Sequence, residues 1–196
     1  FLHNIVSHQD MLRTLRKLIN NNNILHLMLY GPPGTGKTTT IQACARELYG
    51  DSINIMCLEL NASDDRGIGA VRNRINLFAT NNDMDSDLFN SKKRKQKLVI
   101  LDEVDLMTYD AQFALRSVIE ANTKTTRFCL ICNYSTKIIK SLMSRCSIFI
   151  FPLIPYDLHL DHIKSIIKYE NIDIDEEAVK HIVDIAMGDM RRSITI

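Results

Sequence analysis

The 196-residue sequence predicts an α/β fold, in which a parallel sheet is flanked by helices and is followed by a small all-helical segment. Through most of the chain, short apolar runs alternate with segments whose apolar residues recur at helical spacing. One apolar run, Ile24–Tyr30, ends at a glycine-rich segment, and a helical pattern follows it. After Pro152 only helical patterns remain, so we expect one domain over residues 1–151 and a second over residues 152–196.

The elements of the first domain follow from this patterning. Residues 9–19 place apolar side chains on one helical face, and a run of four asparagines at 20–23 ends the helix. The expected strands are 24–30, 54–60, 97–101, 127–132 and 147–151, and the helices between them are 39–49, 68–78, 111–120 and 138–143. The polar segment 80–97, which ends in KKRKQK, is expected to be an exposed loop.

The second domain is expected to hold three helices, over 158–169, over 176–187, and from a start near Asp189. His159 and His162 have the spacing of a pair of metal ligands on the first of these helices. An exposed helix face is the simpler interpretation of the two histidines, and we expect it in preference to a metal site.

Composition restricts the class of protein. The 24 basic and 23 acidic side chains leave a net charge of +1, so any DNA contact requires a local basic surface. No apolar run has the length of a membrane span or the flanks of a signal peptide, so we expect no membrane contact. Five cysteines in apolar settings indicate the reduced thiols of an intracellular protein. Cys129 and Cys132 form a CxxC pair, for which core thiols are favoured over zinc ligands. The chain begins at Phe1, which suggests a fragment of a longer polypeptide.

Residues Gly31 to Thr38, GPPGTGKT, have the spacing of a phosphate-binding loop. Its glycines allow consecutive main-chain N–H groups to point at phosphate oxygens, and the following helix adds the partial positive charge of its N-terminus. Lys37 supplies a compact positive charge, and the Thr38 hydroxyl is a candidate Mg²⁺ ligand.

A second polar cluster follows the strand that ends near Leu101. Asp102 and Glu103 emerge at the edge of the sheet where ligands bind in this architecture. We expect Asp102 to hold a water on Mg²⁺ and Glu103 to polarise the water that attacks the terminal phosphate. A helix cap is the alternative role for such a pair.

Three further polar residues occupy positions at the ends of elements. Asn133 closes the strand FCLIC and either contacts the attacking water and the terminal phosphate or only forms a turn. Arg191 opens the last helix and either reaches the same phosphate or is a surface arginine. Arg145 has no acidic neighbour within four residues on either side, which argues against a structural ion pair.

The segments LELNASDDRGIGAVRNRI, KLVILDEVD, RFCLICN, SRC and GDMRRS resemble the small subunits of replication factor C, the eukaryotic clamp loader of the AAA+ superfamily. The resemblance begins with VSHQD at Val6, covers nearly the whole chain and keeps every motif in the family's order. It implies an AAA+ P-loop core followed by a helical lid domain. Where the family has alanine in its DEAD box this chain has Val104, at a position expected to face the core.

The resemblance implies a Mg²⁺-dependent ATPase and assigns roles to individual residues. The implied catalytic residues are Glu103, Lys37, Asn133 as sensor 1, and Arg145 as an arginine finger that acts in trans on a neighbouring subunit. The implied Mg²⁺ ligands are Thr38 and Asp102. The implied ATP-binding residues are Val6, Gly31, Pro32, Pro33, Gly34, Thr35, Gly36, Lys37, Thr38, Thr39, Asp102, Asn133 and, as sensor 2, Arg191.

The resemblance also implies partners. The chain would join other replication factor C subunits in a nuclear hetero-pentamer that loads the sliding clamp PCNA onto primer–template DNA during replication and repair, with turnover stimulated by DNA and clamp. Arg66, Arg72 and Lys124 would contact the DNA phosphate backbone, and the segment around Phe78 would contact the clamp. The collar domain that holds such pentamers together is absent from these 196 residues.

The sequence alone leaves other functions open. The chain could be a nucleotide-sensing subunit that mainly contributes Arg145 in trans, or a subunit of an alternative clamp loader. A small-molecule kinase is a weaker alternative, because no loop holds the arginine cluster that closes over a phosphate acceptor. The KKRKQK run could be a nuclear-import signal, an extra DNA contact or a soluble loop.

Overall fold

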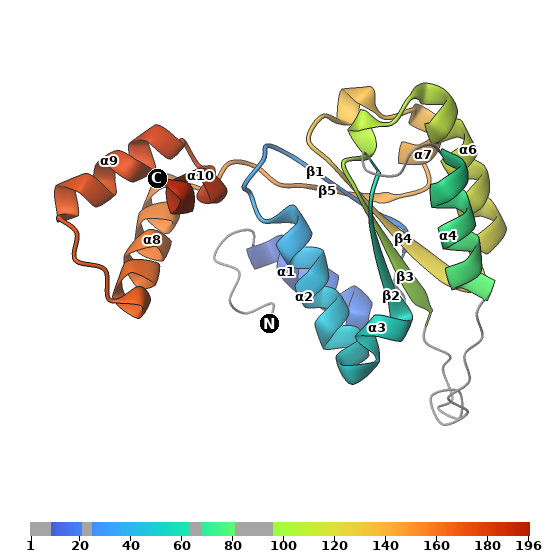
Figure 1. The fold of residues 1–196 in the computed structure, drawn as a ribbon, viewed down its shortest axis with the longest axis horizontal. Coiled ribbons are helices and arrows are strands. Elements are labelled where there is room, and N and C mark those ends of the chain that lie inside the picture. Colours follow the sequence, from blue (N-terminus) through green and yellow to red (C-terminus); the bar gives the residue numbers. More distant parts are fainter. Residues whose placement is uncertain (1–8, 21–24, 63–67, 81–95) are drawn as a thin grey trace.

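The computed structural model describes residues 9–20, 25–62, 68–80 and 96–196. Five parallel strands form one sheet in the order β2-β3-β4-β1-β5 (Figure 1). The strands are β1 Leu27–Tyr30, β2 Cys57–Asn61, β3 Lys97–Asp102, β4 Thr126–Cys132 and β5 Ser147–Ile150. The predicted α/β fold with a parallel sheet is therefore confirmed.

Helices cover both faces of the sheet, as Figure 1 shows for α1 and α2 on one side and α4 and α6 on the other. They are α1 Gln9–Asn20, α2 Lys37–Tyr49, α3 Ile53–Met56, α4 Ile68–Thr80, α6 Tyr109–Asn122 and α7 Lys140–Met143. Single 3₁₀ turns lie at η2 Gly50–Ser52, η3 Val104–Leu106 and η4 Ser135–Lys137. Because both faces are covered, the strands β1, β3 and β4 are almost entirely buried.

Two apolar cores hold these layers together. Leu15 and Ile41 belong to the core between the sheet and α1 and α2, whereas Ile75 and Leu115 belong to the core under α4 and α6. Val104 is fully buried in the second core, as expected for a valine in the position of the family's alanine.

Three helices follow the sheet: α8 Tyr156–Glu170, α9 Glu176–Ala186 and α10 Met190–Thr195. They pack around a small core of their own, which includes Ile163, Val179 and Val183. Figure 1 shows them beside the sheet, beyond a single connecting segment. The division of the chain at residue 151 stays a prediction.

Two sequence-based expectations about the fold are wrong. Residues 54–56, predicted as the start of a strand, continue a short helix, because Ile53 and Met56 pack against the α1–α2 core from a helical turn. His159 is not on an exposed face but is fully buried, and its Nε2 atom lies 2.8 Å from the Ser193 hydroxyl of α10.

Candidate nucleotide-binding site

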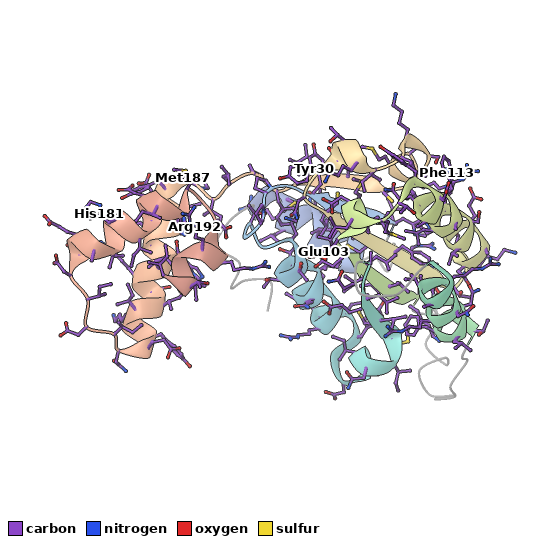
Figure 2. The ribbon with its side chains drawn as sticks, turned by 45° about the horizontal axis from the view of Figure 1, so that its top comes forward. Tyr30, Glu103, Phe113, His181, Met187 and Arg192 are labelled. Atoms are coloured by element: carbon purple, nitrogen blue, oxygen red, sulfur yellow. The ribbon has the colours of Figure 1, made fainter. Side chains whose placement is uncertain are left out.

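A cavity of about 510 Å³ lies at the carboxyl edge of the sheet, between the loop after β1 and the helix α10. In Figure 2, Glu103 lies at the sheet and Arg192 in the three-helix segment beside it. The volume of the cavity is within the usual range for a small-molecule site. The lining residues are Pro33, Gly34, Thr35, Gly36, Lys37, Thr38, Thr39, Asp102, Glu103, Asn133, Ile154, His162, Met190, Arg191, Ile194 and Thr195.

The loop from Gly31 to Gly36 joins the buried strand β1 to the first turn of α2. Gly34 and Gly36 have φ values of 69° and 92°, a left-handed conformation that glycine adopts without steric cost. A side chain built at Gly36 would meet nothing within 4 Å, so the space in front of this turn is open. The Thr40 N–H donates to Gly36 O at 2.9 Å, which starts the helix directly behind the open space. Such a turn at a helix N-terminus suits an anion.

Lys37 is a buried charge at the base of this loop. Its Nζ atom donates to Gly31 O and Pro32 O, each at 2.7 Å, and to Asn133 Oδ1 at 3.0 Å. Burial lowers the pKa of Lys37 from its usual value, and the nearby Asp102 carboxylate opposes that shift. The three acceptors are neutral, and a phosphate oxygen is a stronger, charged acceptor for the same ammonium group.

Two oxygen-bearing side chains meet beside Lys37. The Thr38 hydroxyl donates to Asp102 Oδ2 at 2.7 Å, although the two residues are 64 positions apart in the chain. Asp102 Oδ1 accepts the main-chain N–H of Glu103 at 2.8 Å. A hydroxyl and a carboxylate, without nitrogen or sulfur ligands, form the small set of hard donors that Mg²⁺ prefers when it keeps several waters.

Glu103 has the left-handed φ of 57°, which is uncommon for a residue with a side chain. It stands at the start of η3, between the end of β3 and the buried Val104. Backbone strain of this kind is concentrated at functional sites. The strain therefore adds to the sequence-based reason for singling out Glu103.

Asp105 is a further acidic residue to which the sequence analysis gave no role. Its Oδ2 atom accepts the main-chain N–H groups of Asn133 and Tyr134, each at 3.2 Å, and the residue is buried. No local signal in the sequence marks it, because an aspartate beside an apolar residue is usually exposed and its burial depends on the end of β4 that packs opposite.

The segment after Pro152 contributes side chains that were not assigned to a site from the sequence. Ile154, His162, Met190 and Ile194 line the cavity together with the predicted Arg191. Their helical spacing indicated a second domain, but periodicity alone does not show which helix face covers the phosphate loop.

Arg145 does not line this cavity. It forms an ion pair with Glu120, which also pairs with Arg116 at 3.0 Å, and its Nη1 atom donates to Ser141 O at 2.6 Å. The expectation that Arg145 forms no structural ion pair is therefore wrong. Its acidic neighbour lies 25 residues earlier, on α6, and the packing of α6 on α7 brings the two together. The role in trans stays a prediction.

Two of the three residues predicted to contact DNA are described, and both Arg72 and Lys124 are exposed. They lie on neighbouring segments, because the Asn76 side chain, one turn after Arg72, accepts a bond of 3.3 Å from Asn122, two residues before Lys124. The predictions for Val6, Arg66 and most of the loop 80–97 fall outside the described residues.

The CxxC pair lies within β4, and both Cys129 and Cys132 are buried free thiols. Burial raises the pKa of Cys132 to about 12, which disfavours the thiolate that a metal would require. Within the described part of the chain, no three His, Cys, Asp or Glu side chains are grouped to hold a metal ion. In the same residues, no helix combines the length and apolar character needed to cross a membrane.

Comparison with known proteins matches residues 27–153 to the ATPase family associated with various cellular activities (AAA). Over its whole length, the chain is 52% identical to replication factor C subunit 5 of Homo sapiens. Over the same length, it is 50% identical to probable replication factor C subunit 5 of Dictyostelium discoideum. The matches cover 56% and 55% of those proteins, so the chain spans about half the length of the curated relatives it matches.

The fold is also similar to the RuvB Holliday junction branch migration motor of Thermotoga maritima, with a TM-score of 0.68. That comparison covers 95% of this chain and 58% of the motor at 20% identity, so it supports the fold alone. The resemblance to replication factor C small subunits is confirmed by the relatives. With its phosphate-loop fold and a family match over more than half its length, the chain belongs to the AAA family of ATPases.

Proposed function

We propose that this chain is the nucleotide-binding part of a clamp-loader small subunit, which binds ATP with Mg²⁺ and hydrolyses it. The observation that carries the proposal is the meeting of Lys37, Thr38, Asp102 and Glu103 around one cavity behind a left-handed glycine turn. The names of the full-length relatives supply the wider function.

The residues divide the chemistry among them. The main-chain N–H groups of the loop and the Lys37 ammonium bind the phosphates. Thr38 and Asp102 would hold Mg²⁺, which neutralises charge on the phosphate oxygens when it is bound. Glu103 orients and polarises the attacking water, and Asn133 orients that water and the terminal phosphate from the end of β4.

Arg191 and Arg145 would act on the nucleotides of different subunits. Arg191 lines the cavity from α10, so it couples the position of the three-helix segment to the terminal phosphate. Arg145 lies outside this chain's own cavity and is partly exposed, so we infer that it serves another molecule and not this chain's own nucleotide. We assign it to the nucleotide of an adjacent subunit, where a guanidinium stabilises the charge of the transition state.

The wider proposal follows the relatives named replication factor C subunits. The chain would act in the nucleus within a hetero-pentamer, contact PCNA, and touch primer–template DNA through Arg72, Lys124 and Arg66 on phosphates. Exposure of Arg72 and Lys124 on neighbouring segments supports a shared phosphate contact.

The position of Arg145 also favours a second function, in which the subunit mainly senses nucleotide and supplies an arginine to its neighbour. The two functions differ in the effect of Lys37→Ala in the reconstituted complex. An ATPase subunit loses its own turnover, whereas a sensor subunit tolerates the change and loses activity only with Arg145→Ala.

The decisive variant is Glu103→Gln in the full-length protein within its reconstituted complex. We expect ATP binding by calorimetry to be retained and this subunit's turnover to fall by about 100-fold or more, because a positioned general base contributes about that factor. The matched control is Glu177→Gln, on an exposed turn of α9, which should change neither. Undiminished turnover of Glu103→Gln rejects Glu103 as the base, and absence of ATP binding by the unmodified protein rejects the function.

A further inference from the structure

Asp105 connects the two strands that carry the proposed catalytic groups. It stands in η3, directly after β3, and it reaches across to the end of β4. One carboxylate oxygen accepts two consecutive main-chain N–H groups there, those of Asn133 and Tyr134, each at 3.2 Å. These groups lie beyond the last residue of β4, so the sheet itself does not fix them.

The position of the Asn133 side chain depends on that anchor. Asn133 Oδ1 accepts a bond of 3.0 Å from Lys37 Nζ, which also binds the carbonyls of Gly31 and Pro32. The direction of a side-chain amide follows the backbone that carries it, so a shift of the unpaired end of β4 would also move the Asn133 amide. Because Asp105 fixes the main-chain N–H of Asn133, it also fixes the direction in which the Asn133 side-chain amide points into the cavity.

Stability alone does not account for a carboxylate at this position. Asp105 is 6% exposed, and its second oxygen, Oδ1, is buried with no hydrogen-bond partner within the described part of the chain. A buried charged oxygen without a partner is unfavourable, so the two bonds to Asn133 and Tyr134 are made at a cost in stability. The negative charge does favour the protonated form of Lys37, and so raises the pKa of Lys37 against the larger effect of burial.

We propose that Asp105 is a positioning residue, which sets the Asn133 amide against Lys37 and thereby controls the rate of hydrolysis without binding nucleotide itself. The inference rests on the proposed ATPase function of the site. It goes beyond that function, because it gives the second aspartate of DEVD a role in turnover that is separate from the roles of Asp102 and Glu103.

The test compares Asp105→Ala, Asp105→Asn and Asn133→Ala in the full-length protein within its reconstituted complex. For Asp105→Ala we expect kcat to fall by about 10- to 100-fold, because a misplacement of about 1 Å costs that much, while the ATP dissociation constant changes by less than about 3-fold. Asp105→Asn keeps an acceptor oxygen for both N–H groups and should recover kcat to within about 3-fold of the unmodified protein. The double variant Asp105→Ala/Asn133→Ala should be no slower than the slower single variant.

Asp110 provides the matched control, since Asp110→Ala removes an exposed carboxylate five residues away and should leave kcat unchanged. Full turnover in Asp105→Ala overturns the proposal, and so do multiplicative effects in the double variant or a parallel loss of ATP binding. If Asp105→Ala does not fold, Asp105→Glu decides: it shifts the acceptor by one methylene, and an undiminished kcat in it refutes the role.

The outcome separates this inference from the proposed function. If the unmodified complex hydrolyses ATP and Glu103→Gln silences it, the function stands and Asp105 is judged by its own variants. If the unmodified complex does not hydrolyse ATP, the function fails, and positioning is judged by hydrogen exchange at the Asn133 and Tyr134 amides. Faster exchange in Asp105→Ala than in Asp105→Asn then supports the anchor, and equal exchange overturns it.

Discussion

Replacing Gly34 by alanine should loosen the three-helix segment from the phosphate loop. Gly34 has a φ of 69°, and a Cβ atom added there would lie 1.7 Å from Asp189 Oδ1. The same Asp189 oxygen accepts the N–H of Arg192 at 3.1 Å and so caps α10. The Met190 N–H also donates to Gly34 O at 3.2 Å, which makes this the direct main-chain link between the loop and α10.

The magnitude has two parts. A left-handed conformation costs a residue other than glycine about 1–2 kcal/mol, and this lowers the stability of the whole chain. Displacing Asp189 removes an N-cap worth about 1 kcal/mol and the bond from Met190 worth about 1 kcal/mol. These last two losses, about 2 kcal/mol together, fall on the attachment of α10, because the three-helix segment can move away without unfolding the sheet.

Amide hydrogen exchange and thermal unfolding of the full-length protein separate the two parts. We expect the Met190 amide to exchange about 30-fold faster in Gly34→Ala, the factor that corresponds to 2 kcal/mol. The unfolding midpoint should fall by about 2–8 °C from backbone strain. Gly36→Ala is the matched control for strain, because its φ is 92° but nothing lies within 4 Å of the added carbon. Gly69→Ala controls for the substitution itself, in open space without a positive φ.

The comparison of Gly34→Ala with Gly36→Ala decides the result. Both variants should lose similar thermal stability, but only Gly34→Ala should speed exchange at Met190. Equal exchange at Met190 in the two variants would refute the reasoning, because it would mean that Asp189 and Gly34 do not hold the segment in place.

Two further predictions concern stability. Burial, and then Arg127, lowers the pKa of His26 to about 4, and its Nδ1 accepts the Phe128 N–H at 3.2 Å. The unfolded histidine titrates near 6.5, so the stabilisation of the fold by neutral His26 is complete above pH 6.5 and is lost as pH falls towards 4. We expect this loss to be about 1–2 kcal/mol after allowance for partial exposure. His26→Asn should flatten this part of the pH–stability curve, and an unchanged slope contradicts the assignment. Thr108→Ala should cost about 1 kcal/mol in denaturant unfolding, because Thr108 caps α6, whereas an equal loss in Thr108→Ser would exclude the hydroxyl as the cause.

Much of the fold was predictable because its signals are local. The buried strands β1, β3 and β4 are continuous apolar runs, and the predicted bounds lie within a few residues of those in the structure. The segment 54–56 was predicted wrongly because an apolar run of this length fits a strand or a helical turn equally well. Its packing on the α1–α2 core decides between them.

The candidate site was only partly predictable. Lys37, Thr38, Asp102, Glu103, Asn133 and Arg191 were all singled out in the sequence and all line one cavity. The contribution of His162 and the anchor at Asp105 were not found, because each depends on which element packs opposite. The partner of Arg145 was missed for the same reason, since Glu120 is near in space but 25 residues away in sequence.

The sequence by itself determined the phosphate loop, because three closely spaced glycines and a lysine create an anion cradle within eight residues and need no distant partner. It also determined that strands would be buried and parallel. Only the tertiary structure decided that β4 lies between β3 and β1, and that strand order brings about the contacts from Thr38 to Asp102 and from Asp105 to Asn133. Such contacts join residues that are 64 and 28 positions apart, and the packing of the sheet, which no local pattern encodes, sets their distances.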